Sequence, residues 1–232
     1  MRKKTFNIII SLIILVCLFL VGRFGFTVVK IGEVNKVIQS ETFDPVKYVD
    51  GIWSSKLLPT FDEKSVDLSV ILSEIQVDAK GHVTKDVLVP VAKKYGLITA
   101  GEADEFMVKG TGKVVSLDAS SSSGTMEIQL ANYNGPIKVR IYIGPIIPAN
   151  ETSIRDAVGF IQFGDFQDQT QYGKVATEIN NRVITDVISL LNIESLNGKT
   201  INFEGAFTIR TFNLVVIDLS EIHIVPIKIT VE

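Results

Sequence analysis

The side chains that perform most acid-base and nucleophilic chemistry are scarce in this chain. His82 and His223 are separated by more than half of the sequence, and neither belongs to an H-E-x-x-H motif. The chain has no C-x-x-C or G-x-S-x-G motif, and no glycine-rich loop follows a strand and opens a helix with a Lys-Ser/Thr ending. Structural or surface roles suit both histidines. We therefore predict a protein that is not an enzyme, with no catalytic residue, no metal site and no cofactor.

One segment, Ile143 to Asn180, concentrates charged and aromatic side chains. Arg155 and Asp156 are adjacent opposite charges between apolar stretches, and phenylalanines recur at every third position after them. One interpretation has Arg155 bonding carbonyls or Asp165 to fix a crossover, with the phenylalanines in the core. The other is a polar patch beside exposed aromatic rings, which is typical of surfaces that bind carbohydrate or a partner. The candidates for ligand or partner binding are Arg155, Asp156, Asp165, Phe166 and Gln169.

Two carboxylates of this segment also permit an enzymatic alternative. Asp156 and Asp165 could act as an acid and a base on a carbohydrate, because glycosidases use two carboxyl groups roughly 5–10 Å apart. Their separation along the chain does not fix their distance in space. A carboxylate-dependent carbohydrate-active enzyme therefore remains the alternative to a binding domain.

The elements that would position this segment are strands and a long helix. Alternation of apolar and polar residues predicts three antiparallel strands, at 108–114, 126–130 and 137–143. An apolar stripe with helical spacing predicts a long helix at about 170–192. Further apolar runs predict the final strands, at 201–209, 214–219 and 223–231.

Three strands, a helix and two or three more strands follow the order of an oligonucleotide/oligosaccharide-binding (OB) barrel, although other antiparallel meanders would give the same pattern. We predict an α+β fold in which residues 106–232 form an OB-fold-like antiparallel β-barrel with the inserted helix. Residues 44–105 show helical spacing and are predicted to form a helical layer. Within this layer, one helix is expected around Leu68 to Ile75, capped by Asp62 or Ser65, and another across Asp78 to Gly96 that is kinked or restarted at Pro90.

The N-terminal residues 1–23 predict a membrane anchor or signal segment. The uncharged stretch from Thr5 to Gly22 would span about 27 Å as a helix, close to the thickness of a bilayer core. No small-residue cleavage site follows, which favours an uncleaved anchor. Because the residues before it are basic, the N-terminus is expected in the cytoplasm and residues 24–232 in the periplasm or extracellular space. Residues 24–43 would form a stalk.

Cys17 is the only cysteine, so no intrachain disulfide is possible. It could be lipidated, as in bacterial lipoprotein signals, but Ile14-Leu15-Val16 lacks the small residue that normally precedes the modified cysteine. The alternative is an apolar residue buried in the membrane.

Composition excludes several other classes of protein. Hydrophobic residues make up 46% of the 232 positions and charged residues 21%, which is typical of a globular domain rather than a disordered chain. The formal net charge is −3, and the basic N-terminus makes the remainder more acidic still. An acidic domain is a poor partner for phosphates, so we expect no nucleic-acid binding.

Several phrases of the sequence are similar to a known family. FDPVKYVDGIW (43–53), FMVKGTGKVVS (106–116), IRDAVGFIQFGDFQDQTQY (154–172) and LNGKTINFEGAFTI (196–209) resemble the bacterial domain of unknown function 2291 family of predicted periplasmic lipoproteins. The family's Arg-Asp-Ala run falls on Arg155 to Ala157, and its Phe-x-x-Gln element on Phe166 and Gln169. The resemblance implies an exported, membrane-attached domain with an OB-like barrel, often encoded beside sugar-importing ATP-binding-cassette (ABC) transporters, with no catalytic residues.

These observations favour a membrane-anchored extracytoplasmic binding or adaptor domain. Its expected partners are the membrane, through residues 5–22, and a sugar ABC transporter or the substrate-binding protein of that transporter. A purely structural envelope protein would show no concave polar site around Arg155.

Overall fold

The computed structural model describes residues 43–99 and 101–232 of the chain. The predicted membrane segment 5–22, Cys17 and nearly all of the predicted stalk lie outside these described residues. Within the described ranges, no helix combines the length and the apolar character needed to cross a bilayer. The residues from Asp44 onward form one compact unit.

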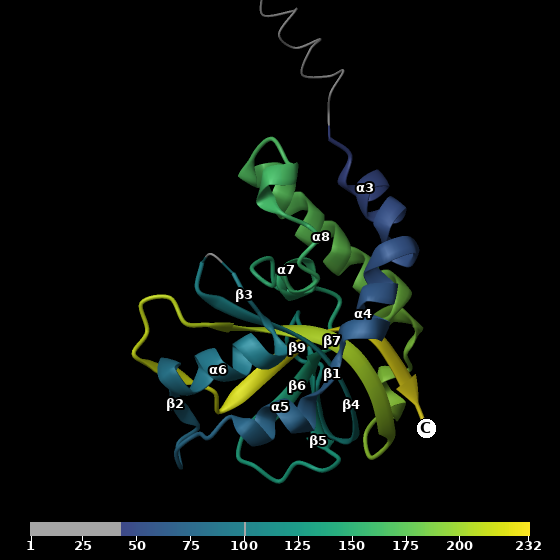
Figure 1. Cartoon of the computed structure of the whole chain (residues 1–232). Helices are drawn as coiled ribbons and strands as arrows, with labels where there is room; N and C mark the ends of the chain where they lie inside the picture. Colours follow the sequence, from purple (N-terminus) through teal and green to yellow (C-terminus); the bar gives the residue numbers. More distant parts are fainter. Residues whose placement is uncertain (1–42, 100) are drawn as a thin grey trace, which may run out of the picture. The chain divides into compact units, whose positions relative to one another are not determined.

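Five strands of this unit are hydrogen-bonded one to the next, and the last of them also pairs with the first (Figure 1). We call this set of strands the five-strand circuit. The strands are β4 (Ala103–Asp118), β5 (Thr125–Leu130), β6 (Lys138–Tyr142), β7 (Thr200–Arg210) and β9 (Glu221–Val231). The pairings run from β4 through β5, β6, β9 and β7, and β7 pairs with β4 again. The long β4 makes this possible because its first part pairs with β7 and its last part with β5. The predicted order of three strands, a helix and final strands is confirmed.

One pairing of the circuit is an exception to the antiparallel arrangement that we predicted for the barrel. Strands β6 and β9 are parallel, with Lys138 opposite Glu221 and Ile141 opposite Ile224. Parallel neighbours need a long crossover between them, and here the helices and β7 supply it. The other four pairings of the circuit are antiparallel.

Short strands extend the large sheet or lie outside it. β1 (Val66–Asp67) and β3 (Leu97–Ile98) both pair with β4. β2 (His82–Thr84) pairs with β8 (Val216–Asp218) in a separate two-stranded sheet. The predicted strand at 214–219 therefore forms in part, but it belongs to this small sheet and not to the five-strand circuit.

Helices account for most of the residues between Asp44 and β4. They are α3 (Pro45–Ile52), a π-helical turn (Trp53–Leu57), α4 (Leu58–Lys64), α5 (Leu68–Glu74) and α6 (Lys85–Tyr95). Asp67 caps α5 by accepting a hydrogen bond from the Ser69 amide at 2.8 Å, so the predicted caps were wrong. The helix predicted across Asp78 to Gly96 is also too long. The Asp78 carboxylate accepts the amides of Lys80 and His82 in a turn, and only the later residues are helical. Pro90 lies inside α6 without ending it.

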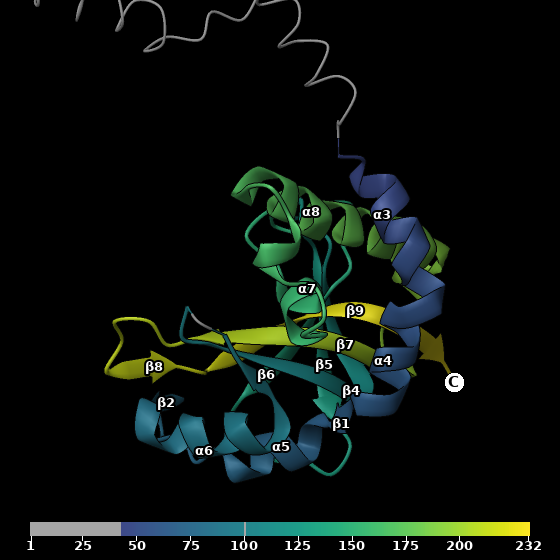
Figure 2. The same cartoon turned by 45° about the horizontal axis from the view of Figure 1, so that its top comes forward.

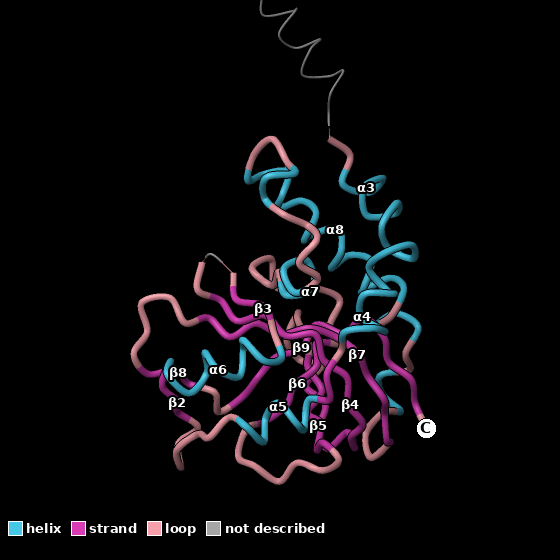
Figure 3. The backbone as a smooth tube through the Cα atoms, viewed as in Figure 1, coloured by secondary structure: helices cyan, strands magenta, loops and turns pink. Residues whose placement is uncertain are grey.

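Helices cover the strands on two sides (Figures 1 and 2). One side carries α7 (Ser153–Ala157) and α8 (Gln169–Asp186), and the other carries α5 and α6. Figure 3 shows the strands gathered between these helical groups. The long helix ends at Asp186, before the predicted limit of about 192, and single 3-10 turns follow it.

The core lies inside the strand circuit and under α5 and α6. Phe106 of β4 and Phe207 of β7 stack at its centre with ring centroids 4.9 Å apart, and both rings are buried. They occupy opposed positions of the antiparallel ladder, where side chains of paired strands meet. Burial of such side chains contributes roughly 1.5–3 kcal/mol each. This core fixes the strand ends against which α7 packs.

Candidate functional site

The candidate site is built around α7, a single turn of helix that packs on β4 and β7. Ile154 and Ala157 are buried against the strands and hold the turn in place. Gly159, shortly after the helix, has a φ of +71°, a left-handed conformation that glycine adopts without strain. The chain therefore reverses sharply after α7, toward the 3-10 turn Phe163–Asp165.

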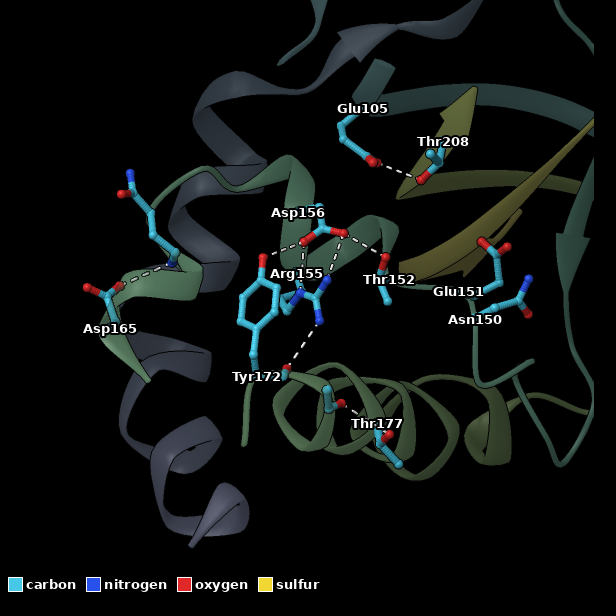
Figure 4. Close-up of polar contacts among 12 residues, drawn as sticks. Glu105, Asn150, Glu151, Thr152, Arg155, Asp156, Asp165, Tyr172, Thr177 and Thr208 are labelled. Atoms are coloured by element: carbon cyan, nitrogen blue, oxygen red, sulfur yellow. Dashed lines mark hydrogen bonds and ion pairs between the residues drawn. The ribbon is translucent and has the colours of Figure 1, made fainter. Parts of the chain in front are cut away.

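A group of four side chains, which we call the Asp156 cluster, links α7 to α8. It consists of Thr152, Arg155, Asp156 and Tyr172 (Figure 4). The Asp156 carboxylate accepts hydrogen bonds from Arg155 Nε at 2.8 Å and Arg155 Nη2 at 2.9 Å. It also accepts the hydroxyl of Thr152 at 2.6 Å and the hydroxyl of Tyr172 at 2.8 Å. Arg155 Nη1 donates to the Tyr172 carbonyl at 3.1 Å. The cluster therefore ties α7 to the first turn of α8.

The charged pair of the Asp156 cluster is largely buried and electrically balanced. The Arg155 and Asp156 side chains are 9% and 13% exposed, and the guanidinium carbon lies 3.6 Å from the centre of the Tyr172 ring. Burial, together with the negative charge of Asp156, raises the pKa of Tyr172 to about 12. The phenol therefore stays a hydrogen-bond donor at neutral pH. Because the two charges compensate each other, the cluster shapes the site without offering a free charge.

Glu105 is a second buried acid at the same site. Strand register places it opposite Thr208, whose hydroxyl donates to the Glu105 carboxylate at 2.6 Å. The residue is 2% exposed. Burial raises the pKa of Glu105 to about 8, and the hydrogen bond from Thr208 opposes this effect. The group is therefore mostly uncharged near pH 7.

Glu151 and Arg210 form the third polar pair. Arg210 Nη2 lies 3.6 Å from Glu151 Oε1 and donates to the carbonyl of Asn150 at 2.8 Å. Burial raises the pKa of Glu151, while the positive charge of Arg210 lowers it. The backbone of Glu151 is tied to α8, because Asn180 Nδ2 donates to its carbonyl at 2.8 Å.

Several of these groups line a cavity of about 630 Å³, which we call the α7 cavity. Its polar lining includes the Asp156 cluster, Glu105, Thr208 and Arg210. Its apolar lining includes Leu97, Ile98 and Phe163, which are 41%, 38% and 55% exposed. The Phe163 ring meets the Tyr172 ring edge-on, with centroids 5.7 Å apart. The cavity thus offers an accessible aromatic wall beside buried hydrogen-bonding groups, which is typical of small-molecule sites.

The structure brings some of the predicted binding residues together and leaves others outside the cavity. Arg155 and Asp156 line it. Phe166 does not, but its ring lies next to the Tyr172 ring, with centroids 5.6 Å apart. The Asp165 carboxylate accepts the amide of Gln162 at 3.1 Å and closes the 3-10 turn. Gln169 is exposed at the first position of α8. Neither of the last two lines the α7 cavity.

The carboxylates of Asp156 and Asp165 belong to separate hydrogen-bond groups. Figure 4 shows Asp165 on the far side of the Tyr172 ring from Arg155, directed at the Gln162 backbone. Asp156 accepts four hydrogen bonds from side chains. This geometry does not support the acid-base pair considered above. Arg155 does bond a carbonyl that ties α7 to α8, as the structural interpretation predicted. Its carboxylate partner, however, is Asp156 and not Asp165.

The histidines also lie apart from any metal-binding arrangement. His223 stacks on Tyr142 with centroids 5.4 Å apart, and burial lowers the pKa of its imidazole. His82 lies 3.7 Å from the Asp78 carboxylate at the surface. Among the residues that the structure describes, no three His, Cys, Asp or Glu side chains gather as a metal site would require.

Sequence reasoning missed Glu105, Thr208 and Arg210. Asp104 and Glu105 directly precede the apolar Phe106 in the sequence. Acidic residues next to a buried strand need polar partners, so this pair could have indicated a polar site. Thr208 and Arg210 carry no such signal. Only the pairing of β4 with β7 brings them beside α7.

Comparisons with known proteins agree with this architecture. A protein-family model described as predicted periplasmic lipoprotein (DUF2291) matches residues 14–230. Among solved structures, the crystal structure of an OB-fold protein from Thermotoga maritima is similar, with a TM-score of 0.61 and 17% sequence identity. The alignment covers 83% of this chain and 100% of that one, and at this identity the likeness extends to the fold alone. No curated protein matches the chain.

Proposed function

Because the chain belongs to the family of predicted periplasmic lipoproteins (DUF2291), we propose that it is a membrane-attached binding domain outside the cytoplasmic membrane, whose α7 cavity receives an uncharged polar small molecule. The family description supports attachment to the membrane from the outer side. Attachment through a retained helix at residues 5–22, or through a lipid on Cys17, remains a prediction.

The fold supports a binding role. The five-strand circuit has the connectivity of an OB barrel, with α7 and α8 inserted between the third and fourth strands of the circuit in chain order. The OB-fold neighbour supports the same topology. We propose that the circuit is a closed barrel, which gives the rigid frame that a preorganised site requires.

The proposal rests on one observation about the α7 cavity: its charged side chains are paired or uncharged, and an exposed aromatic ring lines it. Arg155 is neutralised by Asp156, Arg210 is paired with Glu151, and Glu105 is mostly uncharged near pH 7. A charged ligand would lose its hydration without meeting an opposite free charge, which is costly. A sugar fits better, since its apolar face can stack on Phe163 while its hydroxyls bond the polar lining.

Binding is proposed in preference to catalysis. The carboxylates of Asp156 and Asp165 lie in separate hydrogen-bond groups, and both have structural partners. We extend the proposal to the partner: the bound sugar is shared with a sugar ABC transporter or with the substrate-binding protein of that transporter. The family resemblance is the support for this extension.

Thermal-shift and calorimetric titrations of the full chain in lipid nanodiscs test the ligand. The panel contains neutral monosaccharides, a sugar acid and an amino sugar. We expect saturable binding of a neutral sugar and weaker binding of the charged ones. Phe163→Ala should remove binding, whereas Phe212→Ala, which alters a similarly exposed ring that does not line the cavity, should not. Equal effects of the two variants, or no binding by any neutral sugar, would reject the proposal.

Crosslinking in intact membranes tests the partner. A photoreactive group at Ile98, at the rim of the α7 cavity, should capture a transporter component when the sugar is present. The same group at Lys113, a remote exposed position on β4, serves as the control. Capture of the same proteins from both positions would exclude a specific interaction at the cavity.

A further inference from the structure

A second cavity, of about 640 Å³, adjoins the α7 cavity. Leu97, Glu105 and Gly159 contribute to the lining of both cavities, so the two share a wall. The second cavity is bounded by α4 and the π-helical turn, the end of α6, β4, and the residues that end α7. We call it the lysine cavity because three lysines line it.

The three lysines come from three different elements. Lys56 belongs to the π-helical turn, Lys64 ends α4, and Lys94 lies near the end of α6. Lys94 is paired with Glu74 at 2.7 Å. Within residues 43–99 and 101–232, Lys56 and Lys64 form no ion pair, and the Lys56 ammonium lies 4.1 Å from the centre of the Phe160 ring. The cavity therefore carries an excess of positive charge on a chain whose net charge is negative.

Glu105 does not cancel this excess. It is the only carboxylic acid among the residues that line the lysine cavity, and it is mostly uncharged near pH 7 because burial raises its pKa to about 8. Among the described residues, Glu74 is the only carboxylate that forms an ion pair with one of the three lysines. An anion placed in the cavity would gain attraction from Lys56 and Lys64 without displacing a carboxylate from either lysine.

The wall behind the lysines is apolar. Its residues are Val66, Leu97, Met107, Ala157, Val158 and Phe160. A fully hydrated inorganic anion would leave this wall in contact with water. An organic anion can cover the wall with its apolar part while its head group meets the lysines, so both kinds of lining are used.

We propose that the lysine cavity binds an amphiphilic organic anion, whose phosphate or carboxylate head lies between Lys56 and Lys64 and whose apolar body packs against Met107, Val158 and Phe160. This site is separate from the one proposed for a neutral ligand. The two proposals can therefore fail independently.

Titration calorimetry of the full chain in lipid nanodiscs tests the site with phenyl phosphate, inorganic phosphate and the soluble lipid dihexanoyl phosphatidic acid. Phenyl phosphate is expected to bind about tenfold more tightly than inorganic phosphate, and raising the salt from about 0.05 to about 0.5 M should weaken it. Tighter binding of the phosphatidic acid than of phenyl phosphate would identify the source as a lipid, and the reverse order as a soluble metabolite. Equal affinity for phenyl phosphate and inorganic phosphate would overturn the proposal, because the apolar wall would have no role.

Variants test whether binding depends on the lysines of this cavity or on positive surface charge in general. Lys56→Gln combined with Lys64→Gln should weaken binding of phenyl phosphate about tenfold or more. Lys174→Gln, which removes an exposed charge on α8 away from the cavity, should leave it unchanged. Since Lys56 and Lys64 are exposed, the double variant should keep its thermal midpoint. Unchanged phenyl phosphate binding by a folded double variant would refute the assignment, and Phe163→Ala should leave this binding intact.

Discussion

Replacement of Glu105 by Gln should change how the stability of the protein depends on pH. The variant keeps an oxygen that can accept the Thr208 hydroxyl, and it is nearly isosteric with the original side chain. It removes the titration of a carboxyl group that is 2% exposed and lines both cavities. Any pH-dependent difference between the two proteins therefore reports on this one group.

The expected magnitude follows from the raised pKa of Glu105. The folded protein holds the proton up to about pH 8, whereas the unfolded chain releases it near the ordinary value of 4.5. Between these values unfolding releases a proton, so the free energy of unfolding falls by about 1.4 kcal/mol per pH unit as the pH rises. The stability contributed by Glu105 is complete below pH 4.5, and roughly 5 kcal/mol of it is lost by pH 8. The Gln variant loses none of it.

Urea unfolding of the full chain in a mild detergent gives the measurement. Trp53 is the single tryptophan and is buried, so its fluorescence should report loss of the packed state. The stability of Glu105→Gln relative to the original protein should rise between pH 5 and pH 8 and then level off. Glu63→Gln, at an exposed position on α4, should follow the original protein at every pH. If the curves of Glu105→Gln and the original protein stay parallel from pH 5 to pH 9, the argument for a buried, neutral Glu105 is wrong.

Three further substitutions test the site. Arg155→Met leaves the buried Asp156 carboxylate without its cation and should cost about 3–5 kcal/mol of unfolding free energy, measured by urea denaturation. Tyr172→Phe removes one hydrogen bond to Asp156 but keeps the ring, so about 1.5–3 kcal/mol should be lost in the same assay, and a loss as large as that of Arg155→Met would contradict the geometry. Gly159→Ala adds a Cβ to a residue in the left-handed conformation, which strains the backbone. The free energy of unfolding should fall by about 1–2 kcal/mol, measured by thermal denaturation. An unchanged midpoint would show that the turn is not constrained.

Local patterns predicted the strands well because their causes are local. Met126, Ile128 and Leu130 alternate with polar residues, and in β5 all three are buried. The adjacent charges of Arg155 and Asp156 likewise marked the crossover, since a charged pair between apolar stretches needs partners. These features depend on residues that are close together in the chain.

Features that depend on distant residues could not be predicted in the same way. Glu105 and Thr208 meet only because β7 pairs with β4 in one particular register. The parallel pairing of β6 with β9 follows from the return path of the whole chain. The long helix also ends before its apolar pattern does. Val187 leaves the helical conformation, and Leu190, which lies within the predicted helix, is 76% exposed.

The crystal structure of the protein soaked with the neutral sugar that gives the largest thermal shift would test the central claim most directly. The account predicts the sugar in the α7 cavity, with one face on Phe163 and hydroxyls bonded to the polar lining around Thr208. A sugar bound elsewhere on the surface, or an empty α7 cavity at saturating concentration, would contradict it.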